Sequence, residues 1–398
     1  MTQRLIYLAN IRLPTEKAHG LQIMQNCEAL ADAGWDIRLW IAARRNTPDL
    51  RRTDPFTHYG VRRNFRLRAL PTLDLLPLVP GRADALAKIV FGVQLVTWLI
   101  SACIGVLLSS AEFYYSRDDR ALLLLSLIRP RRQLVYEAHS LAKGRLGTWI
   151  QRRAVRRVGT ILTTTALLRE DLIAIGAPPA RTFTAHDGIR GERFSDMPEQ
   201  GEARRRLGWS PNAFIVGYVG RLQTMAMDKG VGTLVEALAK VEGASLAIVG
   251  GPEDAAEQLR AAWIARGLPP DHFLYTGQMP PDEVPLCLRA FDVCAMPFPA
   301  TTHFARHASP IKLFEYMASG RALVATHLDS TAEIVTDGEN GLLVPPSDPD
   351  ALAAALIRLR DDPALRERLA QTAQAQVFER HTWAARAQTI LNAIKAAP

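Results

Sequence analysis

The feature that most constrains the fold is an alternation of short apolar runs with helix-like stretches, which occurs twice along the 398-residue chain. In the first half, runs bounded by turn residues span residues 5–9, 37–42, 113–115, 134–136 and 160–163. The pattern begins again after residue 200, with runs at 214–219, 245–249, 273–276, 292–296 and 323–325. Strands that alternate with helices form parallel sheets covered on both faces, so the chain is predicted to fold as two α/β units.

The domain boundaries follow from chain length and from one polar stretch. A chain of 398 residues exceeds what one ordinary core accommodates. The stretch MPEQGEARRRLGWSPNA, with two Pro and two Gly, lies between the two units and is typical of a linker and the start of a new domain. We therefore predict a Rossmann-like N-terminal domain over residues 1–195 and a Rossmann-like C-terminal domain over 196–375. Residues 376–398 are predicted to form a helix that can cross back to the N-terminal domain.

Charge and cysteine usage restrict the surroundings of the protein. Residues 1–200 carry 29 Lys/Arg against 18 Asp/Glu, a formal charge of +11, whereas residues 201–398 carry 19 against 22. The basic half predicts contact with something anionic, such as a membrane surface, a lipid phosphate or a nucleic acid. The four cysteines form no C-x-x-C pair and predict free core thiols in a reducing compartment. The first residues lack the features of a signal peptide, so a cytoplasmic protein is expected.

Two segments of the basic half bear on membranes. Residues 89–111 carry no charge over 23 positions, enough to span a bilayer. Because Gln94, Thr97 and Ser101 interrupt this segment, and a span would divide one sheet across the membrane, we expect a buried core helix instead. Residues 129–157 hold nine Lys/Arg and one acid. They predict a basic amphipathic helix around Trp149 that either rests peripherally on an anionic leaflet or is simply a solvated face.

The strongest chemical signals lie in the second unit. The predicted strand FIVGYVG is followed by Arg221, and Lys229-Gly230 begins the next helix. Backbone N–H groups at a helix start, together with fixed cations, favour a phosphate, although solvent-facing charge is the alternative. Ser309-Pro310 is predicted to begin another helix with free N–H groups. Glu315 lies within the apolar LFEYM of that helix, where an unpaired carboxylate is costly, so it is predicted to accept hydrogen bonds from vicinal hydroxyls such as those of a ribose.

Five blocks in order resemble glycosyltransferase family 4 of the GT-B fold: YVGRL followed by DKG, LAIVGGP, FLYTGQMPPDEVPLCLRAFDVCAMP, SPIKLFEYMASGRALVAT, and EIVTDGENGLLVPPSDPDALA. The resemblance implies two Rossmann-like domains whose parallel sheets face across a cleft. It also implies retaining transfer of a hexose from a nucleotide-diphosphate sugar to a glycan or lipid-linked acceptor, in cell-surface polysaccharide or glycolipid synthesis. No cofactor, divalent metal or nucleic acid is expected.

The resemblance also assigns residues in the C-terminal half. Arg221 and Lys229, beside Gly220, would neutralise the donor diphosphate, Glu315 would hold the ribose, and Gly277 to Met279 would lie against the base. Such cations suit the chemistry, because leaving-group departure places negative charge on the diphosphate. The family's E-x7-E pattern is incomplete, since His307 stands in place of the first glutamate. A variant of the family reads S-P-x-K here, which implies donor contacts from Ser309, Pro310 and Lys312.

In the N-terminal half, the loop after the first strand and the end of a later strand carry the candidates. Gly20 would let the backbone approach the donor closely, with His19 and Lys17 beside it. His139 follows the strand QLVYEA, at the end where ligands meet α/β sheets, and resembles the family's histidine that contacts the donor sugar. Glu137 either orients His139 or is an ordinary polar strand end, and Arg117 ends a neighbouring strand. Asp118-Asp119 is expected to cap a helix and not to bind metal.

Two other functions stay open from the sequence. A sugar-nucleotide epimerase or phosphorylase would share the fold. A noncatalytic nucleotide or nucleic-acid binding protein is favoured only by the charge of the first half, and no nucleic-acid motif accompanies that charge. A Rossmann dehydrogenase is disfavoured because LANIRLPTEKAHG lacks G-x-G-x-x-G after its strand.

Overall fold

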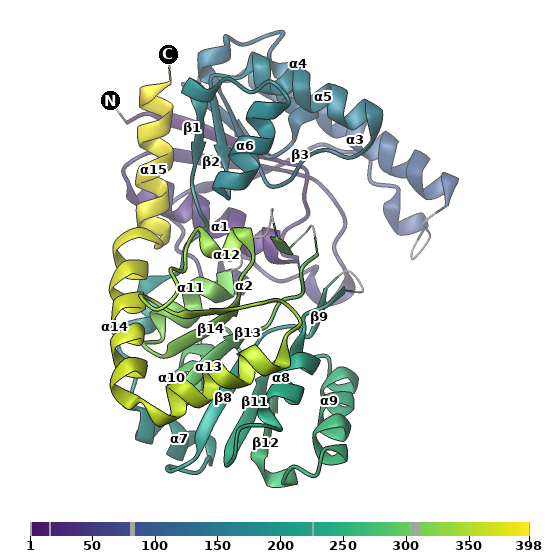
Figure 1. The fold of residues 1–398 in the computed structure, drawn as a ribbon. Coiled ribbons are helices and arrows are strands. Elements are labelled where there is room, and N and C mark those ends of the chain that lie inside the picture. The colour runs from purple at the N-terminus through teal and green to yellow at the C-terminus, as the bar shows by residue number, and fades with distance from the viewer. Residues whose placement is uncertain are drawn as a thin grey trace. The chain divides into compact units, whose positions relative to one another are not determined.

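The computed structural model describes residues 2–15, 17–79, 84–224, 227–301, 304–305 and 311–397. The chain divides into two compact units (Figure 1). Unit 1 comprises Met1–His186 and Trp383–Pro398, and unit 2 comprises Asp187–Thr382. Each unit is built around one parallel sheet with helices on both faces, as the alternation of apolar runs predicts.

Unit 1 contains a seven-stranded parallel sheet in the order β3-β2-β1-β4-β5-β6-β7. Alternate residues of each strand face two different cores, because side chains of a strand point to opposite faces. Helices α1, α2 and α15 cover the face of Leu5 and Tyr7, whereas α3, α4, α5 and α6 cover the face of Ile6 and Leu8. The strands are β1 Arg4–Ala9, β2 Asp36–Ala42, β3 Arg66–Leu70, β4 Phe113–Ser116, β5 Leu134–Ala138, β6 Thr160–Thr163 and β7 Thr182–Thr184. The helices are α1 Ala18–Asp32, α2 Pro55–Tyr59, α3 Ala85–Leu107, α4 Asp119–Leu125, α5 Gly144–Arg157, α6 Ala166–Ala174 and α15 Trp383–Ala396.

Unit 2 contains a six-stranded parallel sheet in the order β12-β11-β8-β13-β14-β15 and a short hairpin. The strands are β8 Phe214–Val219, β11 Ala244–Val249, β12 Phe273–Gly277, β13 Val293–Met296, β14 Ala322–Thr326 and β15 Leu342–Val344, and the hairpin pairs β9 Gln223–Thr224 with β10 Met227–Asp228. The helices are α7 Gln200–Leu207, α8 Val231–Leu238, α9 Glu253–Ala265, α10 Val284–Ala290, α11 Ile311–Ala318, α12 Asp329–Ala332, α13 Pro349–Asp361 and α14 Pro363–Arg380.

All ten predicted strands are present, and the described residues contain five further strands that were not predicted: β3, β7, β15 and the two hairpin strands β9 and β10. The additional strand β3 lies at the edge of its sheet and exposes Arg66 and Arg68, so it lacks an apolar run. Two others, β7 and β15, are three-residue edge strands. Short or charged edge strands are common, because an edge needs protection from pairing with other chains.

The stretch predicted as a linker and the start of a new domain lies inside unit 2. Residues 200–207 form α7, and Arg204 of this helix makes a buried ion pair with Asp292, with 2.7 Å between Nη2 and Oδ2. The division between the units lies at His186/Asp187, before the predicted boundary at 195, because Ile189 and Phe194 already belong to the core of unit 2. The predicted C-terminal helix over 376–398 is two helices, α14 in unit 2 and α15 in unit 1.

The prediction of a buried core helix over residues 89–111 was wrong. The segment forms most of α3, but only one stripe of this helix is buried, made of Val90, Gln94, Trp98, Ala102 and Val106. The cysteines agree with their prediction: all four are free thiols, and Cys27, Cys287 and Cys294 are buried.

Candidate functional site

Three glycines open the carboxyl-terminal edge of the sheet in unit 2. Gly220, Gly250 and Gly277 follow or end the neighbouring strands β8, β11 and β12, with φ of 121°, 128° and 70°. The backbones pass so closely that a Cβ on Gly250 would lie 2.3 Å from the carbonyl oxygen of Gly220. The three glycines with positive φ therefore add no side chains of their own at the ends of these strands, at the place where ligands meet parallel sheets.

Two lysines gather at this edge on aromatic rings. Lys312 of α11 donates a hydrogen bond to the hydroxyl of Tyr218 at 2.7 Å, and its Nζ lies 4.0 Å from the centroid of the Tyr218 ring. Both Lys312 and Lys229 have their Nζ 5.3 Å from the ring centroid of Phe298. The faces of aromatic rings attract cations, so Tyr218 and Phe298 hold two like charges in one place.

The electrostatics of these cations indicate an anion site. Burial and the neighbouring charge of Lys229 lower the pKa of Lys312 well below its ordinary value. Burial and Arg221 likewise lower the pKa of Lys229. Within the described part of the chain, no acidic side chain forms an ion pair with Arg221, Lys229 or Lys312. A bound anion would relieve this repulsion and would favour the charged form of both lysines.

Glu315 lies one turn after Lys312 on α11 and is half-buried. Burial raises its pKa against the opposing charges of Arg193 and Lys312. The next residue, Tyr316, anchors the helix to β8, because its hydroxyl accepts a hydrogen bond from the N–H of Val219 at 2.8 Å. The helix therefore holds Lys312 and Glu315 at a set position relative to the end of β8.

The remaining residues predicted for unit 2 have mixed outcomes. Gly230 caps α8 in a left-handed conformation next to Lys229, as predicted for a helix start. Met279 follows β12 and packs partly against the core of unit 2. Ser309, Pro310 and His307 lie outside the described residues. Contacts of Gly220, Gly277 and Met279 with a donor stay predictions.

In unit 1, a buried carboxylate organises the second cluster of candidates. Glu137 of β5 has no exposed surface, and its Oε1 lies 2.5 Å from Nε2 of His139 and 2.9 Å from Nη2 of Arg117. Arg386 of α15 also lies 2.9 Å from this oxygen, and Tyr115 donates to the other one. Burial alone would raise the pKa of Glu137, but the charges of Arg117, Arg386 and His139 hold it well below its ordinary value. Glu137 thus orients His139, one of the two alternatives open from the sequence.

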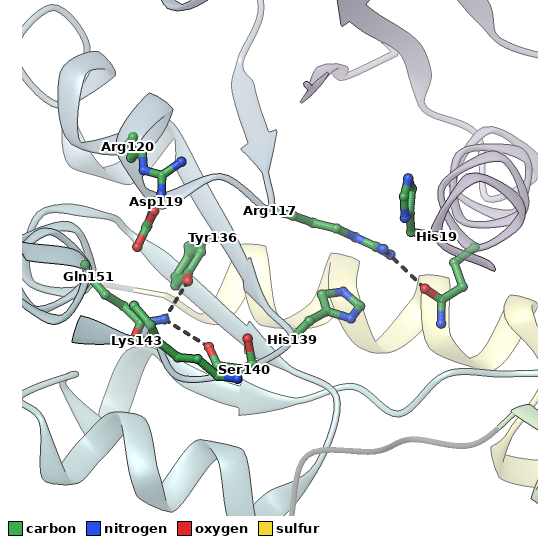
Figure 2. A pocket seen from close by; sticks show the side chains of 12 residues that line it. His19, Arg117, Asp119, Arg120, Tyr136, His139, Ser140, Lys143 and Gln151 are labelled. Atoms are coloured by element: carbon green, nitrogen blue, oxygen red, sulfur yellow. Dashed lines mark hydrogen bonds between the residues drawn. The ribbon is translucent and has the colours of Figure 1, made fainter. Parts of the chain in front are cut away.

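A cavity of about 550 Å³ adjoins this cluster (Figure 2). Arg117 extends between His139 and His19 on one side, and Asp119, Tyr136 and Gln151 lie on the other. Burial, with the charge of Asp118, raises the pKa of Asp119 to about 6. As predicted, Asp118 caps the following helix, accepting hydrogen bonds from the N–H groups of Arg120 and Ala121.

Gly20 has a packing role that the sequence did not reveal. A Cβ at this position would lie 2.2 Å from the hydroxyl of Tyr59 and 2.6 Å from Thr15. That hydroxyl accepts from the N–H of Thr15 at 2.7 Å and donates to its carbonyl at 2.9 Å, so it closes the loop before α1. Lys17 is the exposed N-cap of α1, and His19 lines the cavity. The requirement for glycine at position 20 is thus explained by its packing against Tyr59 and Thr15, without a ligand.

Sequence reasoning missed several residues of both clusters. In the sequence, Tyr218 and Phe298 resemble ordinary aromatic residues of a strand and a core. Their contacts with Lys312 and Lys229 form only in the folded protein. Arg386 is 249 positions from Glu137, and its signal was an arginine within the apolar pattern of α15. Among the described residues, no group of three or more His, Cys, Asp or Glu could hold a metal ion.

Comparison with known proteins gives both units a family. Residues 19–188 match the glycosyl transferase 4-like domain, and residues 213–362 match glycosyl transferases group 1. An alpha-D-kanosaminyltransferase from Streptomyces kanamyceticus is 29% identical over 235 residues, 57% of this chain and 58% of that protein. A phosphatidyl-myo-inositol mannosyltransferase from Mycobacterium leprae is 35% identical over 167 residues, 41% of this chain and 42% of that protein. The chain spans about half the length of such curated relatives.

Solved structures match over the full chain. HepE from Anabaena, in complex with UDP, has a TM-score of 0.73 at 18% identity, covering 99% of this chain and 100% of that one. Sucrose-phosphate synthase from Thermosynechococcus elongatus has a TM-score of 0.73 at 21% identity, covering 98% of each chain. These likenesses show that the two α/β units form the GT-B fold. With the two family matches, the chain belongs to the glycosyltransferases of that fold.

Proposed function

We propose that the protein transfers a hexose from a nucleotide-diphosphate sugar to a hydroxyl of a glycan or lipid-linked acceptor. The transfer retains the anomeric configuration, needs no metal and serves cell-surface polysaccharide or glycolipid synthesis on the cytoplasmic side. The observation that carries the proposal is the group of Arg221, Lys229 and Lys312, whose charges repel one another and lack an acidic ion-pair partner among the described residues. HepE has been solved with UDP and with UDP-glucose, which supports a nucleotide sugar as the donor.

In the proposed reaction the bond between the anomeric carbon and the diphosphate oxygen breaks, and the acceptor oxygen bonds to that carbon. The acceptor hydroxyl proton passes to the leaving diphosphate. Negative charge grows on the diphosphate as the bond breaks, so Arg221, Lys229 and Lys312 stabilise the transition state more than the bound donor. Glu315 would accept hydrogen bonds from the ribose hydroxyls, and His139 would contact the sugar in an orientation set by Glu137.

Titration calorimetry with UDP, GDP, ADP and their sugar derivatives tests the donor site. We expect one nucleotide to bind wild type well. Lys312→Met keeps the length of the side chain but removes a charge-assisted contact, so affinity is expected to fall about tenfold to a hundredfold, or roughly 1.5–3 kcal/mol. Glu315→Gln is expected to lower the affinity for nucleotides, which carry a ribose, but not the affinity for inorganic pyrophosphate.

The matched control is Lys240→Met, which removes a lysine of unit 2 that lies outside the candidate site and pairs with Asp350. It should leave nucleotide affinity unchanged. If Lys312→Met bound the nucleotide as well as Lys240→Met, the donor site would lie elsewhere. If no nucleotide bound wild type, the proposal of a nucleotide-sugar donor would fail. Tight binding without turnover on any acceptor would favour the noncatalytic alternative.

A further inference from the structure

The outer face of α3 is apolar and uncovered. In the described part of the chain, α3 is the one helix long and apolar enough to cross a membrane, yet only 22% of its most apolar window is buried. Ile89 is 64% exposed, Ile100 and Ile104 are each 53% exposed, and Leu107 is 57% exposed. With Val93 and Val96, these residues follow helical spacing, so they form one continuous outward stripe along α3.

The opposite face of α3 is fastened to unit 1. Trp98, Ala102 and Val106 belong to the core on one face of the first sheet. Gln94 donates a hydrogen bond to Asn10 at 2.8 Å, and Gly105 packs so closely on Trp40 that a Cβ would lie 2.9 Å from its ring. A helix held this way lies along the domain and does not cross a bilayer.

The neighbouring helices extend the stripe and add charge. Helix α4 packs against both α3 and α5 on the same face of the sheet. Leu124 and Leu127, on and just after α4, are exposed. On α5, Trp149 is exposed and carries the guanidinium of Arg153 at 5.3 Å from its ring centroid. The exposed basic residues of α5 and its N-cap are Lys143, Arg145, Arg152, Arg153, Arg156 and Arg157.

We propose that this face of unit 1, formed by the outward stripe of α3, Leu124, Leu127 and the basic surface of α5, binds an anionic phospholipid bilayer. The stripe enters the boundary of the acyl chains, and the arginines of α5 contact lipid phosphates. Charge selects a lipid surface over another apolar partner, because the exposed arginines of α5 lie on the same face of the first sheet as α3 and α4. The inference rests on the proposed function only for its purpose, which is to bring the enzyme to a lipid-linked acceptor.

Vesicle flotation of the full chain tests this surface. Wild type is expected to float with phosphatidylglycerol vesicles at low salt and much less with phosphatidylcholine vesicles. The triple variant Ile100→Gln, Ile104→Gln, Leu107→Gln should lower partitioning by about fivefold to tenfold per side chain, because half of each apolar side chain is already in contact with protein. Arg145→Gln, Arg152→Gln and Arg157→Gln together should remove the preference for anionic lipid, about fivefold for each arginine.

Ile264→Gln is the matched control, because this isoleucine of α9 is 48% exposed but belongs to unit 2. It should float like wild type. Nucleotide affinity, measured in every variant, should stay unchanged, so failure of this inference is distinguishable from failure of the donor site. The inference is overturned if wild type ignores phosphatidylglycerol vesicles, or if the stripe variant floats as well as wild type. It is also overturned if the stripe variant converts a dimer to a monomer in sedimentation without any change in flotation.

Discussion

Glu137 is the residue on which the charge balance of unit 1 depends. Its buried carboxylate faces Arg117, Arg386 and His139. Glu137→Gln keeps the shape of the side chain but leaves buried cations uncompensated, so we expect the free energy of unfolding to fall by about 3–5 kcal/mol. Urea denaturation followed by circular dichroism measures this loss. Asp361→Asn, which removes an exposed contact to Arg360, should change stability little, and equal losses in the two variants would contradict the argument.

The same residue predicts a dependence of stability on pH. The pKa of Glu137 in the folded protein lies well below its ordinary value of 4.5, so below that pH the unfolded chain binds more protons than the folded chain. The contribution of Glu137 is therefore complete above about pH 4.5 and is lost as the pH falls toward the folded-state pKa. Glu137→Gln has no such proton to gain, so the difference in unfolding free energy between wild type and variant should narrow in acid. A constant difference from pH 7 to pH 3 would exclude this role.

At the scale of elements, the start of α8 shows how backbone geometry positions a cation. Gly230 has a φ of 75°, and a Cβ there would lie 1.9 Å from the carbonyl oxygen of Pro297. Gly230→Ala is expected to destabilise the protein by about 2–4 kcal/mol, because both the left-handed backbone and the contact resist a side chain. Gly232→Ala is the matched control, since a Cβ there meets nothing within 4 Å. It should be neutral or stabilising by about 0.5–1 kcal/mol in the same urea titration.

The elements also show what the sequence could predict. Buried parallel strands are apolar runs in the sequence, so β1, β8 and β11 were predicted. The edge strand β3 alternates arginines with apolar residues and was not predicted. Helix α3 was found, but it was predicted to be buried, and its exposed apolar face was not predicted. An apolar face packed on a sheet and an apolar face left open have the same composition, and only the neighbours of the helix distinguish them. Arg221, Lys229 and Lys312 were predicted as site residues from motifs, but the aromatic rings that contact the two lysines were not predicted.

At the scale of the whole molecule, unit 1 is formed by two separate parts of the chain, residues 1–186 and 383–398. After α14 in unit 2, α15 packs on the first sheet, with Trp383, Ile390 and Leu391 in the same core as Leu5 and Tyr7. It also supplies Arg386 to Glu137. The charge balance around Glu137 in unit 1 therefore depends on α15, a segment that follows all of unit 2 in the sequence. No sequence pattern near Glu137 could have predicted Arg386 as its partner.

Two separate cores predict two separable unfolding transitions in calorimetry, since multidomain proteins depart from two-state behaviour. Ile390→Ala opens a cavity in unit 1, and Leu356→Ala opens one in the core of unit 2. Each should cost about 2–5 kcal/mol, and each should lower a different transition.

The nucleotide selected by titration then assigns the donor site to a unit. A ligand at a hundred times its dissociation constant stabilises the state that binds it by about 2.7 kcal/mol. Because Arg221, Lys229, Lys312 and Glu315 all belong to unit 2, the nucleotide should raise the transition that Leu356→Ala lowers. It should leave the transition lowered by Ile390→Ala nearly in place. A rise confined to that other transition would move the donor site to the cavity beside His139, and equal rises would mean that both units bind the nucleotide.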